Sequence, residues 1–483
     1  MKGGSGLVIF EGFETLDGEV YSIGVSGGRI ALVNCNSADY PGAEVVDLGG
    51  RFLSPGFIDV HTHFLHCALE REYVDLSAAS GAVEAAEILA SSGSRIGRDY
   101  DDSMWGERLS SAAFDLVRPS VPLFAISRDR HSAVASSEAL RMIAPPAKLG
   151  VGKDGVFTGA AYLWLLTRLS GSRSDSERED AFRRIEAAAF KAGVTTVHAL
   201  EGGAGWGMED AEFMLSKERS ETGIGVVLYP QTTDLSWALE RGMKRIGGCI
   251  LLDGTIGGRT AALCSDYSDR PGERGRLYFS RRALLSFVDR AVRRGMQTAF
   301  HAIGDAAVDL IASVYDEVSK RHGLSDARLR IEHCELMSEG AAEKIAGNGV
   351  FVSVQPAFPF LWEDGLYRRR LGNRRTNAYR TMKNAGIVLG GGSDFGVTDI
   401  CPLFGINAAM NRPCIGERLG AAESIGLFTG DAARFSFGEG EIGCLSVGAS
   451  ADFAVLSGNP AREPVDGIKV AMTIKRGVTV YEA

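Results

Sequence analysis

Through most of the chain, short apolar runs alternate with longer stretches in which apolar positions recur every third or fourth residue. Runs of four to six apolar residues predict buried strands, and the longer period predicts amphipathic helices. The predicted strands between residues 54 and 400 are 57–60, 121–126, 195–198, 224–228, 297–301, 328–333, 350–354 and 387–391. The clearest predicted helices are 176–192, 281–294 and 306–321.

Repeated alternation of strand and helix implies a parallel sheet. With roughly eight strands in this region, the economical interpretation is an α/β fold built on a (β/α)8 TIM barrel. An open doubly wound sheet is the alternative. No Gly-x-Gly-x-x-Gly segment follows a predicted strand, so nothing supports a dinucleotide-binding version of that alternative.

Both ends of the chain read as strands without intervening helices. The predicted terminal strands are 7–10, 21–25, 29–33, 44–48, 445–448, 452–456 and 472–475. We therefore expect residues 1–52 and the end of 406–483 to form one small composite β-sandwich domain, with the barrel over 53–405. Residues 65–120 are less regular and are interpreted as an insertion over the barrel mouth.

Composition narrows the class of partner. The 483 residues carry a formal net charge of −9 without a basic block, which argues against nucleic acid or a membrane surface. The eight cysteines are scattered with no Cys-x-x-Cys pair, and neither a signal peptide nor a membrane-spanning stretch is evident. These features predict a cytoplasmic protein that acts on a small molecule.

The first candidate site ends the strand at 57–60. His61 and His63 are two residues apart, so on a strand they project from the same face. Two adjacent imidazoles form half of a metal site. The alternative for such a pair alone is two solvated loop histidines.

Three more polar residues follow predicted strands: His301, His333 and Asp394. In a TIM barrel the carboxyl ends of the strands converge on one mouth, where polar residues are usually functional. Imidazoles with a carboxylate suit a divalent metal, and zinc accepts such a set while leaving a position open for water. The pattern therefore predicts a metal site closed by the fold.

Several segments resemble one family. Residues 55–63 read Pro-Gly-Phe-Ile-Asp-Val-His-Thr-His, which is similar to the signature of metal-dependent amidohydrolases. Segments 253–261, 301–305, 331–333 and 392–395 resemble the branch of that superfamily that holds N-substituted formamide deformylase and the YtcJ-like hydrolases. The similarity extends over nearly the whole chain, including both terminal β segments.

The resemblance implies the roles of the site residues. His61, His63, His301 and His333 would be metal ligands, and Asp394 would lie near the metal and transfer protons. A metal lowers the pKa of water and polarises a carbonyl, and the aspartate can pass a proton to a leaving nitrogen. The implied reaction is hydrolysis of a C–N bond.

One position departs from the family. The related branch usually carries a lysine where this chain has Cys249. A thiolate is a good zinc ligand and could replace a bridging carboxylated lysine. The alternative is a buried, inert thiol beside a single metal, so one or two ions remain open.

Three residues are candidates for the substrate pocket. His131 lies in a segment similar to one in which the family's histidine faces the substrate, and it could polarise a carbonyl as a second catalytic group; a loop salt-bridge cluster is the alternative. His198 ends a predicted strand and could contact substrate or orient a ligand. Arg259 could bind an acidic substrate group, or pair with Asp253 or Asp269.

The expected function is hydrolysis of an amide, N-formyl, N-acyl or cyclic amide bond by metal-activated water. Two alternatives stay open: a metal-dependent hydrolase or deaminase that acts on another bond, and a non-catalytic regulatory homologue. A homodimer is compatible with the resemblance, because tight dimers are common among such barrels, although no interface is evident in the sequence.

Overall fold

The computed structural model describes the chain apart from residues 1–5, 103–104, 129–131, 172, 204–206 and 221. It divides into two compact units. The first unit contains 1–64, 185–200 and 214–483, and the second contains 65–184 and 201–213. None of the described helices is long and apolar enough to cross a membrane.

The first unit is built around eight strands that follow one another in chain order. A three-stranded sheet has the order β12-β11-β5 and a five-stranded sheet the order β13-β14-β15-β16-β17. Their bounds are β5 Phe57–Thr62, β11 Val194–Glu201, β12 Gly225–Pro230, β13 Arg245–Ile246, β14 Gln297–Ala302, β15 Arg330–His333, β16 Phe351–Val354 and β17 Leu389–Gly391.

Backbone contacts join the edges of these two sheets. Gly247 N donates to Pro230 O at 3.0 Å, which connects the end of β12 to β13. At the other edge, Asp394 N donates to His61 O at 2.8 Å, and Thr62 pairs with Phe395 in parallel. The strands therefore close on themselves, and the predicted (β/α)8 barrel is confirmed.

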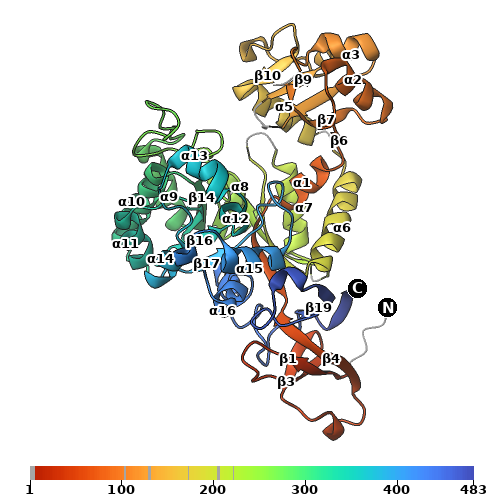
Figure 1. Cartoon of the computed structure of the whole chain (residues 1–483), viewed down its shortest axis with the longest axis vertical. Helices are drawn as coiled ribbons and strands as arrows, with labels where there is room; N and C mark the ends of the chain where they lie inside the picture. The colour runs from red at the N-terminus through yellow and green to blue at the C-terminus, as the bar shows by residue number, and fades with distance from the viewer. Residues whose placement is uncertain (1–5, 103–104, 129–131, 172, 204–206, 221) are drawn as a thin grey trace. The chain divides into compact units, whose positions relative to one another are not determined.

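Helices connect the parallel strands of the barrel. The three helices predicted most clearly are confirmed as α6 Asp175–Lys191, α9 Arg281–Val292 and α10 Asp305–His322. Figure 1 shows α9, α10 and α11 (Glu339–Gly347) outside the strands β14 and β16. On α10 the buried residues recur every three or four positions, because one stripe of the helix packs against the sheet.

The two chain ends pair in one seven-stranded sheet of order β20-β19-β18-β4-β1-β2-β3. Strands from the beginning and the end of the chain lie side by side in Figure 1, and both contribute to one apolar core that includes Phe10 and Phe453. Both chain ends thus contribute strands to one β unit, as predicted, although the described strands form a single hydrogen-bonded sheet. Its strands are β1 Val8–Glu14, β2 Ser22–Ser26, β3 Arg29–Val33, β4 Glu44–Pro55, β18 Phe453–Leu456, β19 Val470–Lys475 and β20 Val478–Glu482.

One predicted terminal strand is wrong. Residues 445–448 form no strand and end in a turn, because Gly448 has a φ of 93° and its N–H donates to Ile30 O. An apolar alternation of four residues is too short to separate a strand from a turn that packs on a core.

The second unit holds its own five-stranded sheet of order β10-β9-β8-β7-β6. Its strands are β6 Val74–Asp75, β7 Ile96–Tyr100, β8 Phe124–Ser127, β9 Ser132–Ala135 and β10 Val156–Thr158. The predicted strand 121–126 belongs to this sheet and not to the barrel, which is a correction. The barrel instead uses β13, a two-residue strand that hydrophobic periodicity is too coarse to reveal.

Candidate metal centre

The barrel brings six predicted residues together at the carboxyl ends of its strands. Their nitrogen, oxygen and sulfur atoms form three overlapping groups within which the ligand atoms lie within 4.8 Å of one another. The groups are His61, His63 and Cys249; Cys249, His301 and His333; and His61, His333 and Asp394. All six side chains are buried.

His61 and His63 extend from the end of β5 and turn their Nε2 atoms toward Asp394. Each Nε2 lies 3.5 Å from Asp394 Oδ1. The opposite ring nitrogens are anchored: His61 Nδ1 lies 2.6 Å from Glu332 Oε2, and His63 Nδ1 lies 2.9 Å from Leu200 O. An anchored Nδ1–H leaves Nε2 free to act as a ligand.

Cys249 lies between the other two histidines. Its sulfur is 3.7 Å from His301 Nδ1 and 3.6 Å from His333 Nε2. The far ring nitrogens are again held, His301 Nε2 by Gly254 O at 3.1 Å and His333 Nδ1 by Gln355 Oε1 at 2.7 Å. Cys249 is therefore the residue common to the group with His61 and His63 and the group with His301 and His333.

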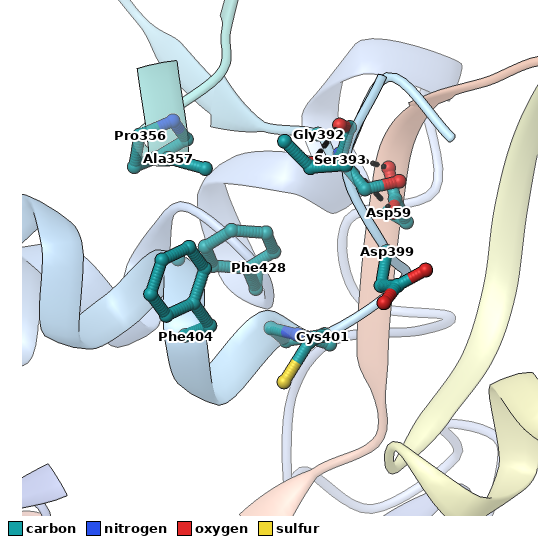
Figure 2. Close-up of a pocket in the computed structure, with 12 residues that line it drawn as sticks. Asp59, Pro356, Ala357, Gly392, Ser393, Asp399, Cys401, Phe404 and Phe428 are labelled. Carbon is teal, nitrogen blue, oxygen red and sulfur yellow. Dashed lines mark hydrogen bonds between the residues drawn. The ribbon is translucent and has the colours of Figure 1, made fainter. Parts of the chain in front are cut away.

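The loop that carries Asp394 is tied to β5 by Asp59. The Asp59 carboxylate accepts from Ser393 N at 3.0 Å and from His61 N at 3.1 Å. Figure 2 shows the Asp59–Ser393 contact beside a cavity of about 10 Å³, enough for about one water molecule. One carboxylate thus fixes both the first histidine and the residue before Asp394.

Glycine is required where β17 meets β5. A Cβ atom on Gly392 would lie 2.5 Å from the Cβ of His61, so a side chain would push the two strands apart. Just beyond, Asp394 has a φ of 51°, in the left-handed region, and so does His333 with a φ of 72°. Non-glycine residues in that region cost energy, and such residues cluster at functional sites.

Burial keeps two of the imidazoles neutral. It lowers the pKa of His301 to about 4 and the pKa of His333 well below its ordinary value. Burial also acts to lower the pKa of His61, but the neighbouring Cys249 and Asp394 outweigh it and raise that pKa. Neutral imidazoles are the form that binds metal.

The acidic groups of the cluster differ in charge. Burial acts to raise the pKa of Asp394, but His61 and the other nearby imidazoles hold it below its ordinary value, so the carboxylate is charged at neutral pH. Burial raises the pKa of the Cys249 thiol to about 11. A metal ion deprotonates a coordinating thiol outright, so this thiol would lose its proton on binding metal.

The residues present fit a metal ion. His61 Nε2 is buried and makes no hydrogen bond within the described part of the chain, which is costly unless another partner occupies that direction. Imidazole nitrogens, a thiol and a carboxylate are the ligand types of zinc. Each histidine also has a partner on its other nitrogen, as metal-bound histidines almost always do.

The remaining predicted residues have different surroundings. His198 is fully buried, and its Nδ1 lies 2.9 Å from Arg330 Nη1. Arg259 donates to both carboxylate oxygens of Asp269, at 3.1 and 2.8 Å. This is the predicted alternative in which Arg259 forms an ion pair within the protein and does not bind an acidic group of the substrate. His131 lies outside the described residues.

Sequence reasoning missed the residues that hold the ligands. Glu332 is fully buried and faces His61, and Arg330 donates to it. Burial acts to raise the pKa of Glu332, but Arg330 and His61 outweigh burial and hold that pKa at about 2. No role is predicted for Gln355 or for the backbone carbonyls of Leu200 and Gly254. The available signal was an alternation of Arg330 and Glu332 inside an apolar strand, where charges are rare unless they are paired.

Curated relatives match most of the chain. It is 29% identical to Protein LONG AFTER FAR-RED 3 of Arabidopsis thaliana, with 86% of this chain and 80% of the relative covered. It is 25% identical to the putative amidohydrolase YtcJ of Bacillus subtilis, covering 92% and 91%. Identity to N-substituted formamide deformylase of Arthrobacter pascens is also 25%, covering 95% and 94%.

Solved structures share the fold. An uncharacterized metal-dependent hydrolase from Pyrococcus furiosus superposes with a TM-score of 0.80 at 24% identity, over 94% of this chain and 100% of that one. Its counterpart from Pyrococcus horikoshii gives a TM-score of 0.81 at 22% identity, over 95% and 99%. The model of the amidohydrolase family matches residues 44–481. Family membership and the buried cluster of candidate ligands support a metal-dependent hydrolase of C–N bonds. The chain therefore belongs to the amidohydrolase family.

Proposed function

We propose that this enzyme hydrolyses the amide, N-formyl, N-acyl or cyclic amide bond of a small molecule, with zinc as its metal. The observation that carries the proposal is the convergence of His61, His63, Cys249, His301, His333 and Asp394 in one buried cluster. The relative named N-substituted formamide deformylase makes N-substituted formamides the first substrates to test.

The cluster supports two metal positions that share a thiolate. We call them the His61–His63 position and the His301–His333 position, with Cys249 common to both. A thiolate favours zinc over magnesium or calcium, which prefer oxygen ligands. Cys249 would then take the place of the bridging lysine of related enzymes, and the centre would assemble without lysine carboxylation.

Zinc in this centre would supply a water of lowered pKa and polarise the substrate carbonyl. Asp394 is charged, and its Oδ1 lies 3.5 Å from both His61 and His63, so it can accept the proton of the attacking water. The same carboxyl group would then donate that proton to the leaving nitrogen. Asp59 holds the loop that carries Asp394 in place for both transfers.

A substrate panel tests the proposal. Zinc-loaded protein would be given N-alkyl and N-aryl formamides, acetamides, cyclic amides, aryl esters and aminopyrimidines, and the release of acid, amine and ammonia would be measured separately. The expected result is amine and acid in equal amounts from the N-substituted open-chain amides, and a single ring-opened amino acid from the cyclic amides. Ammonia from the aminopyrimidines, acid from the esters alone, or no turnover by a protein with full metal would contradict it.

A further inference from the structure

The four histidines of the cluster differ in the group behind them. His63 and His301 donate to the backbone carbonyls of Leu200 and Gly254, and His333 faces the Gln355 side-chain carbonyl oxygen. Each of these acceptors is neutral. Among the described residues, His61 is the ligand whose anchoring nitrogen faces a carboxylate, with 2.6 Å between its Nδ1 and Glu332 Oε2.

A carboxylate near the anchoring nitrogen of His301 is already engaged by backbone groups. Asp253 Oδ1 is 3.7 Å from His301 Nε2, beyond hydrogen-bonding distance. The Asp253 carboxylate accepts three backbone N–H groups, from Ala262 at 2.8 Å, Ile303 at 3.0 Å and Gly304 at 2.8 Å. It organises its loop and adds no hydrogen bond to the imidazole.

Arg330 fixes Glu332 in place inside the barrel. Both residues are completely buried, and Arg330 donates through Nε to Glu332 Oε1 and through Nη2, at 3.0 Å, to Oε2. Arg330 also donates to Val60 O, on the strand that carries His61, and its guanidinium lies 4.5 Å from the ring centre of Tyr229. This ion pair replaces the branched apolar residues that usually fill a barrel interior.

We propose that Glu332, held by Arg330, makes His61 the strongest histidine donor of the cluster. As a result, the His61–His63 position binds its metal ion first and more tightly than the His301–His333 position. Glu332 and Arg330 are positioning residues, since they act through His61 and not on the substrate.

The physical reason is the charge of the acceptor. A hydrogen bond from an imidazole N–H to a carboxylate is charge-assisted and about twice as strong as one to a neutral carbonyl. It raises the basicity of the other ring nitrogen, which is the ligand atom. Burial strengthens the effect, because water does not screen the carboxylate. Asp394 adds a second negative charge beside the same position.

The inference rests on the proposed two-metal centre. One titration distinguishes a failure of the inference from a failure of the two-metal proposal. Protein stripped by a chelator would be titrated with Co²⁺ and with Zn²⁺ against a competing chelator, which gives the number of ions and both stepwise constants. We expect two bound ions. The substitution Glu332→Gln should raise the dissociation constant of the tighter position about 10- to 100-fold, while the dissociation constant of the weaker position changes little.

Two further variants complete the test. Glu335→Gln is the matched control. Glu335 is also buried and follows the same strand, but its Oε2 accepts from Asn377 Nδ2 at 3.3 Å instead of facing a ligand histidine. It should leave both constants unchanged. Gln355→Glu places a carboxylate behind His333 and should strengthen the weaker constant, which tests the idea even if Glu332→Gln destabilises the fold by leaving Arg330 unpaired.

Crystals grown with one equivalent of zinc identify the position that fills first. Anomalous density beside His61 and His63 is expected. Density only beside His301 and His333, or a Glu332→Gln variant that weakens both constants equally or neither, would overturn the inference. A wild-type protein that binds a single ion would instead contradict the two-metal part of the proposed function.

Discussion

Both units of the protein contain parallel strands that end in polar residues, yet among the described residues a cluster of candidate metal ligands is found only in the barrel. In the second unit β6, β7 and β8 end at Asp75, Tyr100 and Ser127. Tyr100 and Ser127 line a cavity of about 540 Å³. In the barrel the strand ends meet in a buried centre, whereas no metal-binding group is found among the described residues of the second sheet.

The difference is closure. In the open sheet each strand end bonds locally: Asp75 accepts from Ser77 N at 2.9 Å, and Ser127 exchanges hydrogen bonds with Ser132. In the barrel, β17 returns to β5, so that residues 61 and 394 become neighbours. Strand ends far apart in sequence then face a common axis, and side chains of several types can converge on one ion.

The largest effect is expected at the residue that moves the proton. Asp394→Asn should lower kcat about 100- to 10,000-fold, because an amide cannot act as the general base. Metal content, measured by mass spectrometry of the purified protein, should remain. Asp364→Asn, an exposed surface residue, serves as control; an active Asp394→Asn enzyme would refute the assigned role.

A second effect concerns the residue shared by the two metal positions. Cys249→Ser should lower the zinc content and the activity, since a neutral hydroxyl is a poor substitute for a thiolate. Wild-type activity should not depend on bicarbonate, whereas a Cys249→Lys enzyme should need it to form the carboxylated lysine. Unchanged zinc stoichiometry and turnover in Cys249→Ser would show that the thiol is not a ligand.

Closure itself can be disturbed at Gly392. Gly392→Ala places a methyl group 2.5 Å from the Cβ of His61 and should cost about 1–3 kcal/mol of folding free energy. It should also weaken metal binding, because His61 must shift. Denaturant unfolding and zinc titration measure the two effects.

Gly340→Ala, in helix α11, is the matched control. An added Cβ there would meet open space, so the change should be neutral or slightly stabilising. If both glycine variants bind zinc equally well, close approach of β17 to β5 does not position the site.

The smallest effect is expected in the open sheet. Hydrogen bonds from Ser77 and the nearby Arg98 hold the pKa of Asp75 below its ordinary value, so its stabilising contribution is present at neutral pH and is lost as the pH falls below about 4. Asp75 is about half exposed, so Asp75→Asn should cost less than about 1 kcal/mol at pH 7, and the cost should shrink progressively as the pH falls below about 4. Zinc content should not change; lost zinc would contradict the separation of the two regions.

Much of this architecture is predictable from the sequence because its signals are local. Apolar runs indicated seven of the eight barrel strands, and polar residues after them indicated His61, His301, His333 and Asp394. The strand 121–126 is wrongly predicted to belong to the barrel. An apolar run indicates that a strand is buried, but it does not indicate which sheet the strand joins.

The groups behind the ligands could not be predicted in the same way. Glu332 and His61 are 271 residues apart, and their contact depends on the register of strands on different sides of the barrel. The acceptor that each imidazole uses follows from the three-dimensional arrangement. Of the four acceptors, two are backbone carbonyls and one is a side-chain amide, and these carry no sequence signal.

The central claim is that Cys249 joins two metal ions at the mouth of the barrel. Anomalous diffraction from crystals of the zinc-saturated protein tests it most directly. The account predicts two zinc peaks, each about 2.3 Å from the Cys249 sulfur, one beside His61 and His63 and the other beside His301 and His333. A single peak, or zinc ions that the Cys249 sulfur does not touch, would contradict it.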